Sequence, residues 1–247
     1  AAGKAFIDLG ADFRLDDPET YKTWYGCDAL YPALHQKAVY GLPELFRDEI
    51  RKTRIIGNPG CYPTSVALGL APALRGGFVE TAGIVIDSKS GTTGAGRGLS
   101  QTTHFPDCNE AFSAYKVASH RHTPEIEQNI AYITGKDLMK PETWQYINFQ
   151  PHLLPQVRGI EVTIYATCDK DFTNEEVYEL YKDFYKDEPF VKVFPSNLPV
   201  QTKWVYGTNF CEMTPTFDKR THRLIVSSVI DNIGKGAAGQ AIQNMNL

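Results

Sequence analysis

The chain has 247 residues, of which 42% are hydrophobic and 22% charged, with a formal net charge of −4 at pH 7. This length and composition predict a globular protein of one large or two small domains, and the acidic balance without a basic run excludes nucleic acid as a partner. No apolar stretch approaches the ~18–20 residues of a membrane span, so we expect a soluble, cytoplasmic protein with no membrane partner.

The cysteine pattern indicates a reducing compartment. Five cysteines are widely spaced, odd in number and without a C-x-x-C pair. Neither a disulfide framework nor a metal site is therefore predicted.

The N-terminal residues predict a short buried strand followed by a polar turn. Ala5–Leu9 is apolar, and Arg14 follows within the turn. Ligands favour the carboxyl ends of such strands, so Arg14 is a candidate for binding a phosphate through its planar donors. A salt bridge to Asp12 or Asp16 is the alternative.

A short helix is predicted from Asp17 to Tyr25, with Pro18 in its first turn. The connection from Gly26 to Pro43 has no strong periodicity, and we assign no role to it.

Residues 57–65, with the sequence Gly-Asn-Pro-Gly-Cys-Tyr-Pro-Thr-Ser, form a tight turn between a strand-like run and a helical pattern. Pro72 is expected to end or kink that helix. Because a helix N-terminus stabilises negative charge, we expect Cys61 to have a lowered thiol pKa, with free amides beside it for an oxyanion. The pattern favours a nucleophile over a buried structural cysteine.

A strand is predicted for Ala82–Ser88, and the most glycine-rich loop of the chain, Gly91–Gly98, follows it. Its glycines allow close approach of the backbone to an anionic ligand, and Arg97 is a candidate for binding a carboxylate or phosphate. A flexible surface loop is the alternative.

Two histidines precede a predicted helix in which Thr123 is the N-cap and Pro124 the first residue. Positive charge is disfavoured there, so His120 and His122 should be neutral near pH 7, as a general base must be. Glu125 is placed to orient or charge-balance His122. We prefer His122 as the base and His120 as a residue of the acyl pocket or oxyanion site, while the spacing leaves the reverse assignment open. Cysteine with histidine suggests acyl transfer through a thioester.

The second half of the chain is predicted to be mostly sheet with one face buried. The expected strands lie within Glu110–Val117, within Tyr146–Cys168 as two strands joined around Pro151–Pro155, and in Phe210–Phe217 and Arg223–Ile230 as a hairpin. Thr173–Glu176 is a capping box for one further helix.

The pattern Gly234-x-Gly236-x-x-Gly239 matches the dinucleotide fingerprint. Too little sequence follows it for a second strand and an acidic residue about 20 positions on, so a closing helix is preferred.

Five ordered motifs resemble those of the N-acetyl-gamma-glutamyl-phosphate reductase family. They are Gly57–Thr64, Ser90–Arg97, His120–Ile126, Pro151–Pro155 with Arg158–Ile160, and Asp231–Ala241. The resemblance implies NADPH-dependent reduction of N-acetyl-L-glutamyl 5-phosphate to N-acetyl-L-glutamate 5-semialdehyde through a Cys61 thioester, in arginine biosynthesis.

The same resemblance implies the roles of further residues. Arg14, Arg97, Ser90 and Gly91 would bind the substrate, and Asn58, Pro59 and Asn232 would contact NADP(H). A homo-oligomer, dimer or tetramer, is also implied.

The implied fold class is α/β, with a glyceraldehyde-3-phosphate dehydrogenase-like catalytic domain whose mixed sheet is largely antiparallel. Residues 1–60, joined by the closing helix in 232–247, would be a remnant of a Rossmann-type NADP-binding domain, and 61–231 the catalytic and dimerisation domain. Family members begin with a strand, a Gly-rich turn and a helix that this chain lacks, so we expect a truncated or processed product. Such a chain should acylate Cys61 but reduce the thioester very slowly.

Two other function classes use the same residues differently. A cysteine–histidine hydrolase or amidotransferase would pass the acyl group to water or an amine, and an inactive assembly fragment would do neither. Aldehyde formation with NADPH distinguishes them.

Overall fold

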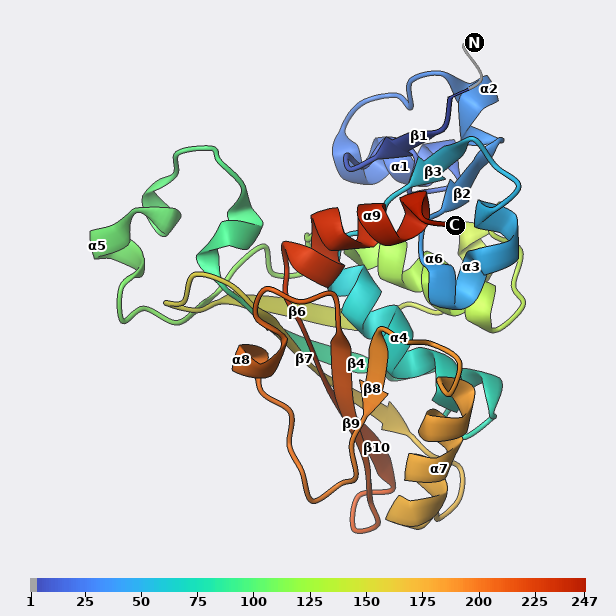
Figure 1. The fold of residues 1–247 in the computed structure, drawn as a ribbon, viewed down its shortest axis with the longest axis vertical. Coiled ribbons are helices and arrows are strands. Elements are labelled where there is room, and N and C mark those ends of the chain that lie inside the picture. Colours follow the sequence, from blue (N-terminus) through green and yellow to red (C-terminus); the bar gives the residue numbers. More distant parts are fainter. Residues whose placement is uncertain (1–3) are drawn as a thin grey trace.

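The computed structural model describes residues 4–247, and its strands form two separate sheets (Figure 1). Residues 1–3, the first of the expected cofactor-domain remnant, lie outside the described part. The smaller sheet is parallel and has the order β1 (Phe6–Asp8), β3 (Ile55–Gly57), β2 (Ala38–Tyr40). The strand predicted at the N-terminus is therefore confirmed, but its predicted burial is wrong, because Phe6 is exposed and Ile7 and Asp8 are only half-buried.

Short helices accompany the small sheet: α1 (Pro18–Tyr25), α2 (Pro32–His35) and α3 (Pro43–Ile50). The first begins as predicted, because the Asp17 carboxylate accepts the backbone N–H of Thr20 at 2.7 Å and so caps the helix. Gly26 ends it in the left-handed conformation, with φ 73°.

The larger sheet has seven strands. In spatial order they are β5 (Ser113–Ala114), β6 (Asn148–Leu153), β4 (Val85–Ser90), β7 (Ile160–Thr167), β10 (Arg223–Ile230), β9 (Cys211–Asp218) and β8 (Val191–Val193). The pairs β4–β6 and β8–β9 are parallel and the other neighbours antiparallel. This mixed, largely antiparallel sheet confirms the predicted fold class, and β9 with β10 confirms the predicted hairpin.

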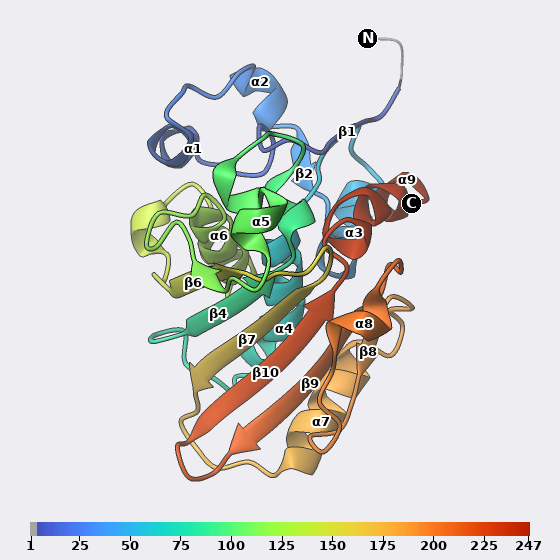
Figure 2. The ribbon, with the colours of Figure 1, turned by 90° about the vertical axis from the view of Figure 1, so that its left-hand side faces the viewer.

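Long helices cover one face of the large sheet (Figure 2). Helix α4 (Cys61–Arg75) packs on β7, β9 and β10, α7 (Asn174–Phe184) packs on β8 and β9, and α6 (Thr123–Ile133) packs on α4. The capping box of α7 is formed as predicted. On the opposite face, the short helix α8 (Thr202–Val205) contacts β10.

Pro72 does not end α4, which continues to Arg75. A proline has no N–H for the carbonyl four residues earlier, here that of Leu68. The hydroxyl of Tyr185 on the neighbouring segment donates to the Leu68 oxygen instead, and that of Tyr181 donates to the Gly69 oxygen at 2.7 Å. Tertiary hydrogen bonds thus replace those that the proline removes.

Two strand predictions need correction. Of the strand expected within 110–117 only Ser113–Ala114 forms, because Glu110 and Lys116 have positive φ values of 58° and 45°, which extended chains do not adopt. The connection after β6 lies beyond Pro151, which pairs with Ser88 inside the sheet.

The C-terminal segment returns to the small sheet. One turn of π-helix, Gly234–Ala238, leads into α9 (Gly239–Met245), which packs on α3 and β1 (Figure 1). The predicted closing helix is confirmed.

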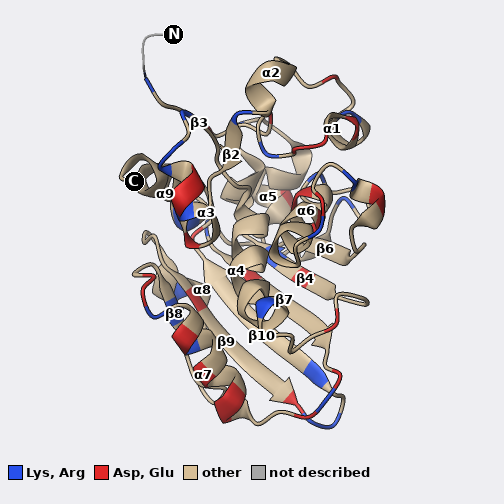
Figure 3. Ribbon diagram, turned by 90° about the vertical axis from the view of Figure 1, so that its right-hand side faces the viewer, with Lys and Arg blue, Asp and Glu red and all other residues tan. Residues whose placement is uncertain are grey.

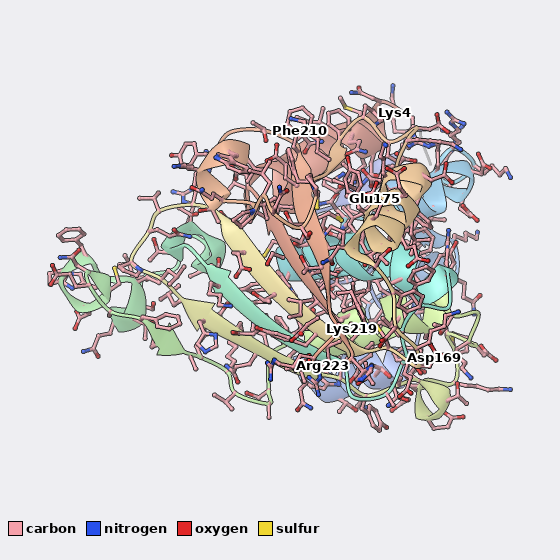
Figure 4. All side chains as sticks on the ribbon, turned by 90° about the horizontal axis from the view of Figure 1, so that it is seen from below. Lys4, Asp169, Glu175, Phe210, Lys219 and Arg223 are labelled. Atoms are coloured by element: carbon pink, nitrogen blue, oxygen red, sulfur yellow. The ribbon has the colours of Figure 1, made fainter. Side chains whose placement is uncertain are left out.

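An arm carrying α5 (Phe105–Cys108) projects from the body (Figure 1). Basic and acidic residues are interspersed over the ribbon (Figure 3). Seen from below, Phe210 lies at one end of the β9–β10 pair and Lys219 and Arg223 at the other (Figure 4). No helix within residues 4–247 is long and apolar enough to cross a membrane.

Candidate active site

Cys61 is the first residue of α4 and is half-buried. Gly60 before it is extended, with φ −67° and ψ 153°, so the chain bends sharply from β3 into the helix. The bend is crowded: a side chain at Gly57 would place its Cβ 2.1 Å from the Phe13 carbonyl oxygen. The glycines of this turn are therefore required by close backbone approach.

The sequence predicted a lowered pKa for the Cys61 thiol, and this prediction is wrong. Burial raises the pKa of the Cys61 thiol to about 11. The backbone N–H of Tyr62 and the charge of Arg14 lower this pKa, as a helix start and a cation should, but burial outweighs them. The Cys61 thiol is thus protonated at neutral pH, and a base is required before its sulfur can act as a nucleophile.

Both imidazoles are neutral at pH 7, as predicted, although burial is the main cause. Burial, with smaller contributions from Lys116 and Arg121, lowers the pKa of His120 to about 4. Burial, with smaller contributions from His120 and the nearby cations, lowers the pKa of His122 well below its usual value. The helix begins at Thr123, so His122 is its N-cap and Thr123 is not, contrary to the prediction.

The two histidines have different hydrogen-bonding capacity. The backbone N–H of His122 donates to His120 Nδ1 at 3.1 Å, so the ring proton of neutral His120 is assigned to Nε2. His120 therefore offers a donor. The Nε2 of His122 packs on the residue before the nucleophile: a Cβ at Gly60 would lie 2.6 Å from it.

Glu125 is almost fully buried and holds the turn before Cys61. Its Oε1 accepts the Gly60 N–H at 2.7 Å and the Tyr40 hydroxyl at 2.8 Å. Asn129 donates to the same hydroxyl at 3.0 Å. These bonds orient the Cys61 turn, whereas we expected Glu125 to orient His122.

Arg14 faces the same turn. Its Nε donates to the Asn58 carbonyl at 2.8 Å, and its Nη1 lies 3.6 Å from Glu125 Oε2. The ion pair is thus with Glu125, and neither Asp12 nor Asp16 is the partner that the alternative named.

A pocket with a volume of about 610 Å³ joins most of the predicted substrate residues. Arg14, Ser90, Gly91, His120 and His122 all line it. Arg97 lines a neighbouring pocket on the projecting arm instead.

Sequence reasoning missed two cations of this pocket, Lys116 and Arg121. Arg121 stands between the two histidines in the sequence, which is a signal that could have identified it. Lys116 lines the pocket from a backbone position with positive φ, and no sequence pattern predicted that conformation.

The residues predicted to contact the cofactor are engaged in internal bonds. Asn58 donates to the Ala237 carbonyl at 3.0 Å and accepts from Asn244 at 3.1 Å. Asn232 accepts the Gly159 N–H at 2.7 Å and donates to Thr93 at 3.0 Å. Pro59 is buried in the turn between Asn58 and Gly60.

A family model and the relatives that match this chain agree on its family. Residues 61–232 match the family model described as semialdehyde dehydrogenase, dimerisation domain. The chain is 52% identical over 245 residues to the N-acetyl-gamma-glutamyl-phosphate reductase of Pelotomaculum thermopropionicum, covering 99% of this chain and 69% of that protein. It is 51% identical over 248 residues to the reductase of the same name from Symbiobacterium thermophilum, with coverage of 100% and 69%.

Among solved structures, the fold is similar to aspartate semialdehyde dehydrogenase II from Vibrio cholerae. The TM-score is 0.65 with 17% sequence identity, over 86% of this chain and 68% of that one. A likeness at this identity concerns the fold alone.

Proposed function

From the premise that this chain belongs to the N-acetyl-gamma-glutamyl-phosphate reductase family of semialdehyde dehydrogenases, we propose that Cys61 forms a thioester with N-acetyl-L-glutamyl 5-phosphate, which is then reduced to N-acetyl-L-glutamate 5-semialdehyde. The observation that carries the proposal is the Cys61 turn. A cysteine starts a helix there, with an imidazole packed on the preceding residue and an arginine bound to the same turn.

The first step uses only groups of this chain. His122 takes the proton of the Cys61 thiol, the sulfur bonds to the acyl carbon, and the bond from that carbon to the phosphate oxygen breaks. His122 returns the proton to the departing group, which leaves as hydrogen phosphate. Arg14 would pair with the phosphate, and the assigned Nε2–H of His120 would donate to the acyl oxygen.

The residues present fit the nicotinamide end of a cofactor. Leu9, Gly10 and Ala11 follow β1 of the parallel sheet and line the pocket together with His122, at the kind of strand end where nucleotides bind. When bound, the cofactor supplies a hydride to the thioester carbon, which yields the aldehyde and the thiolate. The family implies a nicotinamide cofactor. We propose that this cofactor is NADP(H) and that Asn58, Pro59 and Asn232 contact it.

Domain division and assembly belong to the same proposal. Two separate sheets support a division into residues 1–60 with 232–247 and residues 61–231. The dimerisation-domain match supports a homo-oligomer, which we propose to be a dimer or tetramer. We propose arginine biosynthesis in the cytoplasm as the setting.

The test follows both half-reactions. The purified chain is mixed with N-acetyl-L-glutamyl 5-phosphate, and the adduct is located by mass spectrometry of peptides while NADPH absorbance is followed. We expect acylation at Cys61, followed by very slow aldehyde formation that depends on NADPH. Release of N-acetylglutamate without aldehyde would favour a hydrolase, and an unmodified Cys61 in a folded sample would contradict the nucleophile assignment.

A further inference from the structure

A lysine with no exposed surface lies in the π-helical turn near the C-terminus. Lys235 Nζ donates to Glu44 Oε1 at 2.6 Å and to Gln243 Oε1 at 2.7 Å. The Glu44 side chain is buried as completely. Burial alone would raise the pKa of Glu44, but Lys235 holds that pKa below its usual value, so the pair is charged.

Stability alone does not explain such a pair. Moving two charges out of water is costly, and buried ion pairs can often be replaced by apolar residues without loss of stability. A role in placing the backbone around Lys235 is therefore worth seeking, and π-helical turns are frequent at functional sites.

The residue after Lys235 is in contact with the nucleophile. A Cβ at Gly236 would lie 2.8 Å from the Cβ of Cys61 and 3.3 Å from its Cα. Before Lys235, the Asp231 carboxylate accepts the N–H of Gly234 at 3.0 Å. The turn is thus held immediately before Gly236, by the cap at Gly234 and by the buried ion pair at Lys235.

Residues 40–44, which include Glu44, also bind the turn before Cys61. Tyr40 donates to Glu125, which accepts the Gly60 N–H. The Gly41 carbonyl accepts from the Asn244 amide at 2.8 Å, so α9 is docked on this stretch as well. The residue before Cys61 and the turn that contacts Cys61 are therefore both tied to one segment of the small-sheet region.

We propose that the Lys235–Glu44 ion pair is a positioning device for Cys61, which holds Gly236 against the nucleophile and sets its place relative to His122 and Arg14. This inference rests on the proposed role of Cys61 as the acylated residue. Lys235 acts through the backbone of its neighbour and touches no reacting atom. Small displacements matter here, because an error of about 1 Å in a reacting group can lower a rate about 100-fold.

The decisive variant removes both charges at once, as Lys235→Met with Glu44→Gln. Gln243 then keeps both partners, because Asn209 donates to its Oε1 at 3.0 Å and an amide oxygen at position 44 takes the place of the carboxylate oxygen that accepts from its Nε2 at 2.9 Å. The matched control is Lys182→Met with Glu179→Gln, which removes an exposed ion pair of 2.9 Å on α7. Three quantities are measured for each: the midpoint of thermal unfolding, the acylation rate with N-acetyl-L-glutamyl 5-phosphate, and the pH profile of Cys61 alkylation by iodoacetamide.

We expect the double variant to unfold near the native midpoint, to acylate about 10- to 100-fold more slowly, and to show a shifted alkylation profile. The control should change none of the three. A folded double variant with native acylation and alkylation would overturn the proposal, because a merely structural pair predicts that result.

If the double variant does not fold, Glu44→Asp decides. It keeps the charge but shortens the side chain that anchors Lys235 by one methylene group, so a folded protein with slowed acylation and a shifted alkylation profile supports the proposal, and one with native rates and profile overturns it. Failure of the proposed function gives a different result from failure of this inference. If the native chain is never acylated, the proposed function fails, but the alkylation profiles of the native chain and the variants can still be compared to test the positioning role.

Discussion

The carboxylate of Glu125 accepts the backbone N–H of Gly60 at 2.7 Å, which ties the residue before Cys61 to the helix that follows the two histidines. The nucleophile and the candidate base are thus held relative to each other by one buried hydrogen bond. The same carboxylate also accepts from Tyr40.

Replacing Glu125 should destabilise the fold through the donors that it leaves unpaired. For Glu125→Ala we expect a loss of about 1–3 kcal/mol in the free energy of unfolding for each buried donor left without a partner. Tyr40→Phe keeps the Gly60 bond but leaves one buried donor, the Asn129 amide, without the hydroxyl that accepts from it, so we expect a loss of about 1–3 kcal/mol for one donor against two for Glu125→Ala. Urea unfolding of both variants measures the difference, and equal effects would contradict the role given to Glu125.

Reaction of Cys61 with iodoacetamide should rise steeply with pH. Because burial raises the thiol pKa to about 11, the thiolate fraction grows about tenfold per pH unit from pH 7 to 10. The raised pKa also stabilises the folded state below the unfolded thiol pKa of about 8.5, and this contribution is lost as pH rises toward 11. Peptide mass spectrometry at each pH follows the reaction, and a plateau below pH 9 would mean a less buried thiol.

The variant Cys61→Ser tests whether the sulfur atom of Cys61 is the nucleophile. Cys61→Ser should give no acylated mass with N-acetyl-L-glutamyl 5-phosphate, since a hydroxyl in this site ionises far less than a thiol. Cys211→Ser, a buried cysteine elsewhere in the core, is the control and should keep acylation in any sample that folds. Acylation of the Cys61→Ser chain would place the nucleophile at another residue.

Two histidine variants separate base from donor. His122→Asn should lower the acylation rate about 10²–10⁴-fold, the usual contribution of a general base, and leave a rate that increases with hydroxide concentration. His120→Gln should lower the rate while keeping the native pH profile, because a donor to the acyl oxygen does not accept the thiol proton. Rates measured from pH 6 to 10 compare them, and exchanged profiles would reverse the two roles.

Arg14 should determine affinity for the phosphate. Arg14→Lys keeps the charge but loses the planar donors, so we expect the KM for the acyl phosphate to rise about tenfold or more. Arg75→Lys, at the far end of α4, should leave the KM unchanged. Arg97→Lys tests the other predicted arginine, for which we expect a smaller rise because it lines the neighbouring pocket.

The sequence by itself determined the local features of this protein. Gly60 and Cys61 indicated the start of α4, Thr173 and Glu176 indicated a capping box, and alternation in β7 indicated a half-buried sheet. Each of these depends on residues close together in the chain, so a linear pattern carries it. The ordered motifs likewise indicated the family.

Only the tertiary structure decided what surrounds those features. The thiol pKa of Cys61 depends on atoms buried over it, among them Gly236, which is far away in sequence. The stretch from Tyr40 to Glu44 had no recognisable pattern, yet it anchors both Glu125 and Lys235. Burial and long-range hydrogen bonds arise when distant segments pack together, and no local pattern records which segments those are.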